Sequence, residues 1–248
     1  MNVNIQDNIE NCRISVCIAT YNGEHYISEQ LESIISQLNI DDEIIVSDDG
    51  SVDDTLKIVE SYKKTFPNLT IVNGPRKGFS SNFGNAIKYA CNEIILFSDQ
   101  DDIWCDNKVT LIRKAFAEDD KITSILHTMY TFENDKKIDT RSIIIKYKEG
   151  VFKNFVKSCY WGCCMAVRAN FIKRFIPFRD CCVGHDQLVG LMSEKFGETL
   201  FLDRPLIWHR LHANNTSNKR TIKQMLQFRL QLIQDYLVAK KKYMRNVP

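Results

Sequence analysis

Three carboxylates lie within four residues of the chain, at Asp99, Asp101 and Asp102. They follow the apolar run from Glu93 to Phe97, which has the length and composition of a buried strand. Carboxylates this close repel one another and need a counter-charge, which a hard cation such as Mg²⁺ or Mn²⁺ supplies through oxygen ligands. A solvated turn that caps a following helix is the competing interpretation, and these residues alone leave both open.

A second acidic pair, Asp48-Asp49, ends another predicted strand, from Glu43 to Val46. The pair could form a turn with a helix cap, followed by Gly50 and Ser51. Alternatively, a carboxylate could accept a hydrogen bond from a nucleobase or ribose, as acids at strand ends do in nucleotide-binding α/β folds. The turn is slightly favoured on these residues alone.

The loop Thr20-Tyr21-Asn22 follows a third predicted strand, from Arg13 to Ala19. Its tyrosine could pack locally, or it could stack on a flat base. Polar groups therefore follow three strands at the point where each strand ends, which is where open α/β sheets bind ligands.

The elements that must position these groups alternate between strand and helix. The expected strands are residues 13–19, 43–46, 69–72 and 93–97, and the expected helices are 24–38, 53–66 and 81–90. This alternation predicts an α/β fold with a doubly wound, mostly parallel sheet.

The second half of the chain is less regular. A strand is expected at 122–132, a loop-like charged segment at 134–148, a helix at 185–196, and two strands at 199–202 and 206–211. Asp186, near the start of that helix, would by itself be a cap or dipole partner. His212 alone would more often be a surface histidine than a ligand.

Composition excludes several classes of protein. The chain has 248 residues, 44% of them apolar and 26% charged, which is typical of a globular domain. A net charge of +2 gives no indication of a nucleic-acid partner. We expect no membrane-spanning helix and no secretory signal, because no apolar run is long enough and the first residues are polar. The nine cysteines include no CxxC pair, so we expect reduced thiols and a cytoplasmic protein.

The tail from Lys219 to Arg245 is basic, with Asp235 as its single acid. Apolar residues recur there at helical spacing, at positions 226, 230, 233 and 237. Such a basic amphipathic helix could lie on an anionic membrane surface, or it could pack on the domain with a solvated basic face.

Taken in order, the motifs resemble glycosyltransferase family 2, whose members have the GT-A fold. The resemblance rests on ISVCIATYNGEHYISEQLESIISQ, EIIVSDDGSVDDT, EIILFSDQDDIW, GHDQLV and RLHANN. It implies an N-terminal tail at 1–12, a GT-A domain at 13–215 and a helical C-terminal tail at 216–248. Within the domain, residues 13–105 would bind the donor and residues 106–215 the acceptor.

The resemblance also implies roles for individual residues. On the donor side, the loop 20–22 would hold the nucleobase, and Asp49 would contact the uracil or thymine edge. Asp99 and Asp101 would form the DxD pair, with Asp101 on a Mn²⁺ or Mg²⁺ ion that bridges the donor diphosphate, and Asp102 in support.

Residues of the second half would complete the site. Arg210 and His212 would approach the diphosphate or the metal, and Asp186 matches the catalytic base of the family. His185, which precedes it, would support the site or contact the acceptor. The segment with Trp161 and Gly162 resembles the acceptor side, although a core tryptophan is nearly as consistent with the sequence.

The implied activity is inverting, metal-dependent transfer of a hexosyl or deoxyhexosyl group from a UDP- or dTDP-sugar to a glycan hydroxyl. DQDDIW resembles enzymes of bacterial O-antigen and capsule synthesis, whose acceptor is often linked to polyprenyl diphosphate. Such an enzyme would work at the cytoplasmic face of the inner membrane. An inactive sugar-nucleotide-binding relative and a nucleotidyltransferase are the alternatives, although ATYNGEHY lacks the Gly-rich basic loop that a nucleotidyltransferase needs.

Overall fold

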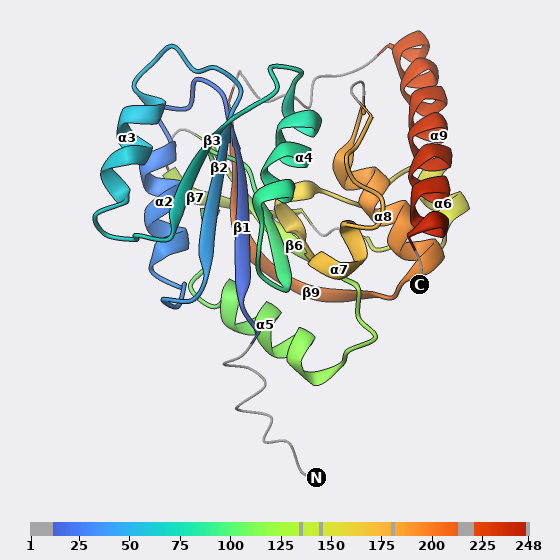
Figure 1. The fold of residues 1–248 in the computed structure, drawn as a ribbon, viewed down its shortest axis with the longest axis horizontal. Coiled ribbons are helices and arrows are strands. Elements are labelled where there is room, and N and C mark those ends of the chain that lie inside the picture. The colour runs from blue at the N-terminus through green and yellow to red at the C-terminus, as the bar shows by residue number, and fades with distance from the viewer. Residues whose placement is uncertain (1–11, 134–135, 144–145, 180–181, 213–220, 247–248) are drawn as a thin grey trace.

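A computed structural model describes residues 12–133, 136–143, 146–179, 182–212 and 221–246. Within these residues, nine strands form one sheet in the order β3-β2-β1-β4-β8-β6-β9-β5, with β7 paired to β6. Helices flank the sheet, and α9 stands at one side of the molecule (Figure 1). The predicted α/β class is confirmed.

The first half of the chain forms the parallel part of the sheet. Its strands are β1 (Ile14–Thr20), β2 (Glu43–Asp48), β3 (Leu69–Asn73) and β4 (Ile94–Ser98), and its helices are α2 (Ile27–Ile35), α3 (Thr55–Tyr62) and α4 (Phe79–Tyr89). β1 pairs in parallel with β2 and β4, and β2 pairs in parallel with β3. The alternation in the sequence predicted each of these elements.

The second half makes the sheet mixed. Its strands are β5 (Ile103–Trp104), β6 (Ser124–Glu133), β7 (Lys136–Ile143), β8 (Met165–Arg168) and β9 (Thr199–Leu211). β8 is antiparallel to both β4 and β6, whereas β9 runs parallel to β6 and antiparallel to β5. The mostly parallel arrangement therefore holds for the first half only.

Two expectations for this half were wrong. The charged segment predicted as a loop contains β7, because it pairs with β6 in an antiparallel ladder. The two strands predicted at 199–202 and 206–211 are one strand, β9, whose register against β6 shifts between them.

The remaining helices surround the second half of the sheet. They are α5 (Lys108–Glu118), α6 (Val151–Val156), a 3₁₀ turn (Gly162–Cys164), α7 (Ala169–Ile172), α8 (His185–Phe196) and α9 (Ile222–Arg245). α9 begins with a capping box in which Thr221 and Gln224 satisfy each other's backbone N–H groups. Residues 213–220, which include Lys219 and Arg220 of the predicted basic tail, lie outside the described residues.

The core lies on both faces of the parallel strands. Ile14, Val16 and Ile18 of β1 are fully buried, as are Ile95 and Phe97 of β4. Near-continuous apolar runs of this kind are expected where helices cover both faces of a strand. No helix among the described residues has the length and apolarity needed to cross a bilayer.

Candidate active site

The acidic turn after β4 is anchored to β9 through Asp102. This side chain is 1% exposed, and its Oδ1 atom accepts hydrogen bonds from His209 Nδ1 at 2.7 Å and from the Arg210 N–H at 3.2 Å. Burial alone would lower the pKa of His209, but the Asp102 carboxylate raises it to about 12. Asp102 and His209 therefore form a buried ion pair that fixes the turn against the strand.

Asp101 and His212 form a second link between the turn and the end of β9. His212 Nε2 lies 2.8 Å from Asp101 Oδ2, and its ring stacks on Tyr26 with 5.0 Å between centroids. A carboxylate oxygen and an imidazole nitrogen held this close can share a divalent cation. The structure thus brings together two of the three predicted metal ligands.

The third predicted ligand, Asp99, belongs to the same charged cluster. Burial and the neighbouring carboxylates of Asp102 and Asp101 raise the pKa of Asp99 to about 8. Burial and Asp102 also raise the pKa of Asp101, although His212 opposes this shift. In addition, Asp102 Oδ2 is buried without a hydrogen-bond partner. The cluster is short of positive charge, so these residues fit a bound divalent cation.

One other group among the described residues could hold a metal: Asp102, Cys163 and His209, all of which are buried. Its carboxylate is already paired with the histidine. Lys108, which is fully buried and donates to the Cys163 carbonyl at 2.9 Å, adds a further cation nearby. These contacts indicate a structural cluster, so the Asp101–His212 pair fits the predicted metal better.

Arg210 contacts the backbone of the acidic turn. It is 3% exposed, and its guanidinium packs over the rings of Tyr26 and Phe132. It forms an ion pair with Glu29 at 2.5 Å and donates through Nε to the Asp101 carbonyl at 3.1 Å. In this structure Arg210 therefore supports the backbone of Asp101, and its contact with a diphosphate stays a prediction.

Asp186 is placed at the start of α8, in the same electrostatic environment as the acidic turn. Its side chain is partly buried, and Oδ1 accepts a hydrogen bond from the Gln187 N–H at 2.8 Å. Its charge contributes to the raised pKa of Asp99. A Cβ atom at Gly162 would lie 3.7 Å from the Asp186 Cβ atom, and the preceding Trp161 contacts His209, the partner of Asp102. Asp186 therefore lies in the neighbourhood of the acidic turn, and its role as the base stays a prediction.

His185, by contrast, is a packing residue. Its ring stacks on Phe83 with centroids 4.3 Å apart and meets the edges of Phe79 and Phe97. Neither ring nitrogen has a hydrogen-bond partner, and burial lowers the pKa of His185 to about 3. A Cβ atom at Gly162 would lie 2.9 Å from His185 Nε2, so a glycine is needed there.

This burial predicts acid sensitivity. His185 stays neutral in the folded protein down to about pH 3, whereas an unfolded histidine takes up a proton below about pH 6.5. Its contribution to stability is therefore complete above pH 6.5 and falls with pH, by about 2 kcal/mol between pH 7 and pH 5. Urea unfolding at both pH values should show a smaller loss for His185→Leu than for wild type. Equal losses would contradict this assignment.

The first loop is held by a residue that the sequence analysis did not single out. Gln100 Oε1 accepts from the Tyr21 N–H at 2.9 Å, and Gln100 Nε2 donates to the Tyr21 carbonyl at 3.1 Å. The Tyr21 side chain is 58% exposed, whereas Thr20 is buried and donates to Asp48. The position of Gln100 inside the acidic turn was the only indication of this role.

The second loop joins the first. The Val52 N–H donates to Asn22 Oδ1 at 2.9 Å. Asp49 accepts hydrogen bonds from the N–H groups of Arg76 at 2.8 Å and Gly78 at 3.0 Å, which fixes the segment before α4. Each carboxylate oxygen has a second acceptor position, so the expected contact of Asp49 with a base stays a prediction.

Trp161 lies beside the acidic turn. It is partly buried, and its ring meets the edge of His209 with 6.2 Å between centroids. It precedes Gly162, whose neighbours are His185 and Asp186. This position is compatible with the predicted acceptor side, and stacking on an acceptor sugar stays a prediction.

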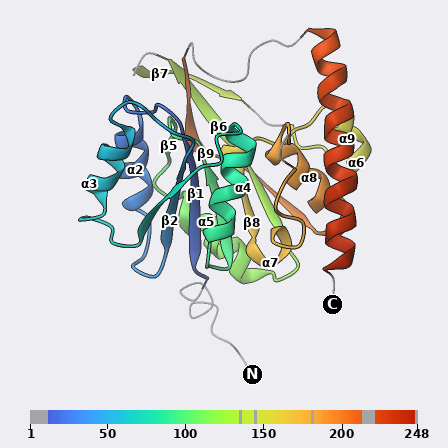
Figure 2. The same cartoon turned by 45° about the horizontal axis from the view of Figure 1, so that its top comes forward.

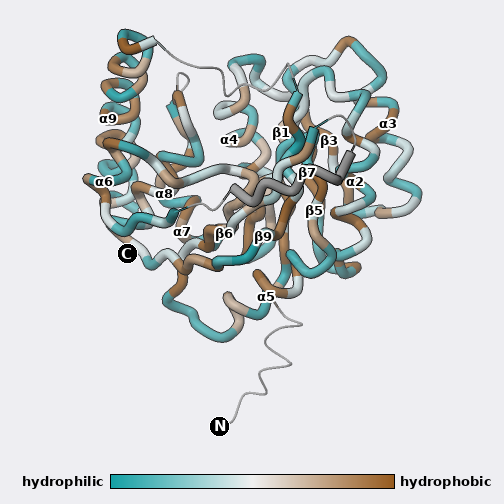
Figure 3. The backbone as a smooth tube through the Cα atoms, turned by 180° about the vertical axis from the view of Figure 1, so that it is seen from behind, coloured by the Kyte–Doolittle hydropathy of each residue, from teal (hydrophilic) through white to brown (hydrophobic). Residues whose placement is uncertain are grey.

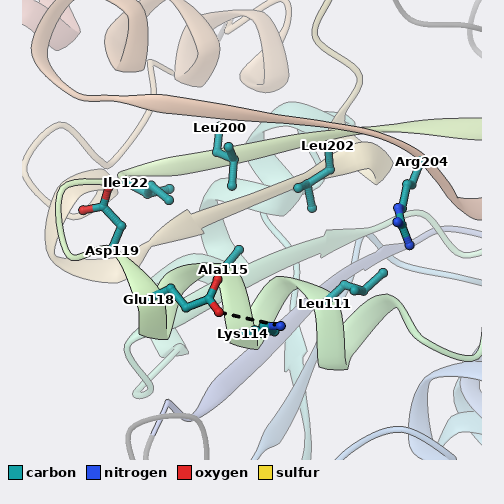
Figure 4. Close-up of a pocket in the computed structure, with 9 residues that line it drawn as sticks. All are labelled: Leu111, Lys114, Ala115, Glu118, Asp119, Ile122, Leu200, Leu202 and Arg204. Atoms are coloured by element: carbon teal, nitrogen blue, oxygen red, sulfur yellow. Dashed lines mark ion pairs between the residues drawn. The ribbon is translucent and has the colours of Figure 1, made fainter. Parts of the chain in front are cut away.

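A separate hollow of about 310 Å³ lies between α5 and β9 (Figure 4). Leu111 and Ala115 line it from α5, and Leu200 and Leu202 line it from β9. An ion pair between Lys114 and Glu118 lies at its edge. None of its lining residues belongs to the acidic turn, so it is distinct from the candidate site.

Comparisons with known proteins identify the family of the chain. The family described as "Glycosyl transferase family 2" matches residues 15–175. The dTDP-rhamnosyl transferase RfbG of Shigella flexneri is 30% identical over 215 residues, which cover 80% of this chain and 72% of RfbG. The Escherichia coli UDP-Glc:alpha-D-GlcNAc-diphosphoundecaprenol beta-1,3-glucosyltransferase WfgD is 30% identical over 158 residues, or 62% of this chain and 59% of WfgD.

Solved structures share the fold. S. aureus TarS 1-349 in complex with UDP-GlcNAc aligns with a TM-score of 0.68 and 21% identity, over 94% of this chain and 71% of that chain. The mannosyltransferase PcManGT of Pyrobaculum calidifontis, in complex with GDP-Man and Mn²⁺, aligns with a TM-score of 0.61 and 18% identity, over 95% and 65%. The chain thus has the GT-A fold, belongs to glycosyl transferase family 2 and is a glycosyltransferase.

Proposed function

We propose that this enzyme transfers a hexosyl or deoxyhexosyl group from a UDP- or dTDP-sugar to a glycan hydroxyl, with inversion at the anomeric carbon. The observation that supports the proposal is the position of Asp186 beside Gly162, near the acidic turn, where its charge adds to those of Asp101 and Asp102 around Asp99 in a cluster that suits a cation. An inverting transfer needs one base and one site of charge stabilisation, and no second nucleophile.

Asp186 is the proposed general base. It takes the proton of the acceptor hydroxyl as that oxygen attacks the anomeric carbon. Asp101 and His212 would hold the divalent cation, and the bound cation would offset the negative charge of the leaving nucleoside diphosphate. Because the pair combines an oxygen with a nitrogen ligand, we favour Mn²⁺ over Mg²⁺, which prefers oxygen ligands throughout.

Tyr21 is the proposed platform for the nucleobase. Its ring is exposed while Gln100 holds its backbone, so no large rearrangement is needed for stacking. Tyr21→Ala should weaken UDP or dTDP binding about tenfold, because a base–aromatic contact contributes on the order of 1–3 kcal/mol. Calorimetric titration tests this, with Tyr89→Ala as a matched control on another exposed tyrosine. Equal weakening by both variants would remove Tyr21 from the site.

For the acceptor, we propose a glycan linked to polyprenyl diphosphate, in O-antigen or capsule synthesis at the cytoplasmic face of the inner membrane. The name of WfgD, which specifies a diphosphoundecaprenol-linked acceptor, supports this class. The similarity to RfbG supports dTDP-rhamnose as a donor to test.

The deciding experiment is a donor screen on the purified protein. UDP-galactose, UDP-glucose, UDP-N-acetylhexosamines and dTDP-rhamnose would each be offered with Mn²⁺ or Mg²⁺ and a synthetic lipid-diphosphate sugar. Mass spectrometry should show one added sugar with one donor. Binding of donors without hydrolysis or transfer would favour an inactive sugar-nucleotide-binding relative. In a parallel reaction with a nucleoside triphosphate and a sugar 1-phosphate, formation of a sugar nucleotide with release of pyrophosphate would favour a nucleotidyltransferase.

A further inference from the structure

α9 is held on the domain by one face only. Phe228, Leu232, Ala239 and Tyr243 are buried on that face. Tyr243 stacks on Phe196 at the end of α8, with 4.7 Å between centroids. The helix is therefore packed against the domain without using the apolar residues that the sequence places on its amphipathic face.

Those residues form an exposed apolar row, here called the outer stripe. Its members and exposed fractions are Ile222 (74%), Leu226 (62%), Leu230 (63%), Ile233 (42%) and Leu237 (57%). They follow one another at intervals of three or four residues, so they share one side of the helix. Figure 3 shows hydrophobic positions recurring along α9. A row of exposed apolar side chains of this kind indicates an interaction site.

The short helix α6 extends this surface. It lies beside α9 (Figures 1 and 2), and Phe155 packs edge-on against Tyr236 with 5.4 Å between centroids. Two apolar side chains of α6 point to solvent, Phe152 at 81% and Val156 at 66% exposure. Two helices thus expose apolar residues on neighbouring parts of the molecule.

The exposed charged side chains of α6 and α9 are all positive. The exposed lysines are Lys223, Lys240 and Lys241 on α9 and Lys153 and Lys157 next to the apolar residues of α6. The only acid of α9, Asp235, is 2% exposed and forms an ion pair with Arg179 at 3.1 Å. The surface therefore combines apolar side chains with cations and lacks an exposed acid on either helix.

We propose that the outer stripe, together with Phe152 and Val156, docks the enzyme on an anionic lipid bilayer. The apolar side chains enter the boundary between headgroups and acyl chains, and the lysines meet anionic headgroups. A second copy of the chain fits this surface less well, because a symmetric pairing would bring lysines of the two copies together.

Docking of this kind would hold the reactive end of α8 near the bilayer. Arg229 donates to Gln187 Oε1 at 3.0 Å, directly beside Asp186. A Cβ atom at Gly184 would lie 3.3 Å from Phe228, so α9 also contacts the turn before α8. If the acceptor is the lipid-linked glycan proposed above, its hydroxyl arrives on this side; the docking itself does not depend on that proposal.

The test is sedimentation of the whole protein with vesicles. Wild type should bind vesicles of phosphatidylcholine with phosphatidylglycerol, and bind vesicles of phosphatidylcholine alone at least about tenfold more weakly. The triple variant Leu226→Ser/Leu230→Ser/Ile233→Ser should lose about tenfold or more of the binding. Lys240→Gln/Lys241→Gln should reduce the preference for phosphatidylglycerol. Ile40→Ser, which changes an apolar residue 82% exposed elsewhere, should bind as wild type does.

Three outcomes would overturn the proposal: no vesicle binding by wild type, unchanged binding by the triple variant, or a dimer in light scattering that the triple variant converts to monomer. Transfer to a soluble glycan acceptor separates this result from the proposed function. The triple variant should keep that activity, whereas a failure of wild-type transfer alongside normal vesicle binding would reject the function and leave the docking surface in place.

Discussion

Asp186→Asn is expected to lower the rate of sugar transfer by about a hundredfold or more, the scale of a lost general base. The amide keeps the size of the side chain and cannot take the proton of the acceptor hydroxyl. The loss should fall on kcat, since Asp186 lies outside the proposed base-binding loops and donor affinity should change little. Steady-state kinetics with the donor identified in the screen, together with nucleotide titration, measures both quantities.

Asp203→Asn is a suitable control, because Asp203 is an exposed carboxylate of β9 away from the acidic turn. Its kinetics should match those of wild type. Wild-type kcat in Asp186→Asn would remove this residue from the mechanism and leave the structure without an assigned base.

Asp101→Asn should lower both Mn²⁺ affinity and transfer, each by a factor of about ten to a hundred or more. The reason is that the Asp101 carboxylate is one of two side chains in the pair suited to the cation, with His212 at 2.8 Å. Calorimetric titration of Mn²⁺ in the presence of UDP measures the affinity, and activity should recover in part at higher Mn²⁺ concentration.

Asp102→Asn provides the contrast, because it removes the partner of the buried His209 rather than a proposed ligand. Removing one member of a buried ion pair costs about 3–5 kcal/mol of unfolding free energy. Asp102→Asn should therefore be distinctly less stable to urea, whereas Asp101→Asn should unfold as wild type does. If Asp101→Asn binds Mn²⁺ normally, the cation site lies elsewhere.

The parallel half of the fold was predictable because its information is local. A buried strand such as β1 reads as a continuous apolar run, and α2 reads as helical spacing, so alternation alone gave their order. The ends of these strands then located the polar loops, since ligands in open α/β sheets bind at the carboxyl ends.

The rest of the sheet depends on pairing between distant segments. β7 is charged and reads as a loop, and it becomes a strand because β6 offers it an edge. β8 is only four residues long, and its antiparallel direction is set by β4 and β6 on either side. Such partners are not visible in a single segment of sequence.

The site residues also fall into those that local motifs reveal and those that depend on distant partners. Asp101 and Asp186 were identified from motifs, but several residues that position the acidic turn and the first loop were not. Gln100, Glu29 and His209 act through partners far away in the sequence, at Tyr21, Arg210 and Asp102. His185, predicted to support the site or contact the acceptor, lies in an aromatic cluster. Its role depends on tertiary burial, which the local motif does not reveal.

The double hydrogen bond of Gln100 has a consequence for how substrates assemble. The Gln100 side chain binds the backbone of Tyr21, and the Gln100 backbone lies between Asp99 and Asp101 of the DxD pair. A ligand that orders the acidic turn should therefore also order the loop at Tyr21, and the reverse should hold. Cation and nucleotide should consequently bind as linked events, each increasing the affinity for its companion by the same factor.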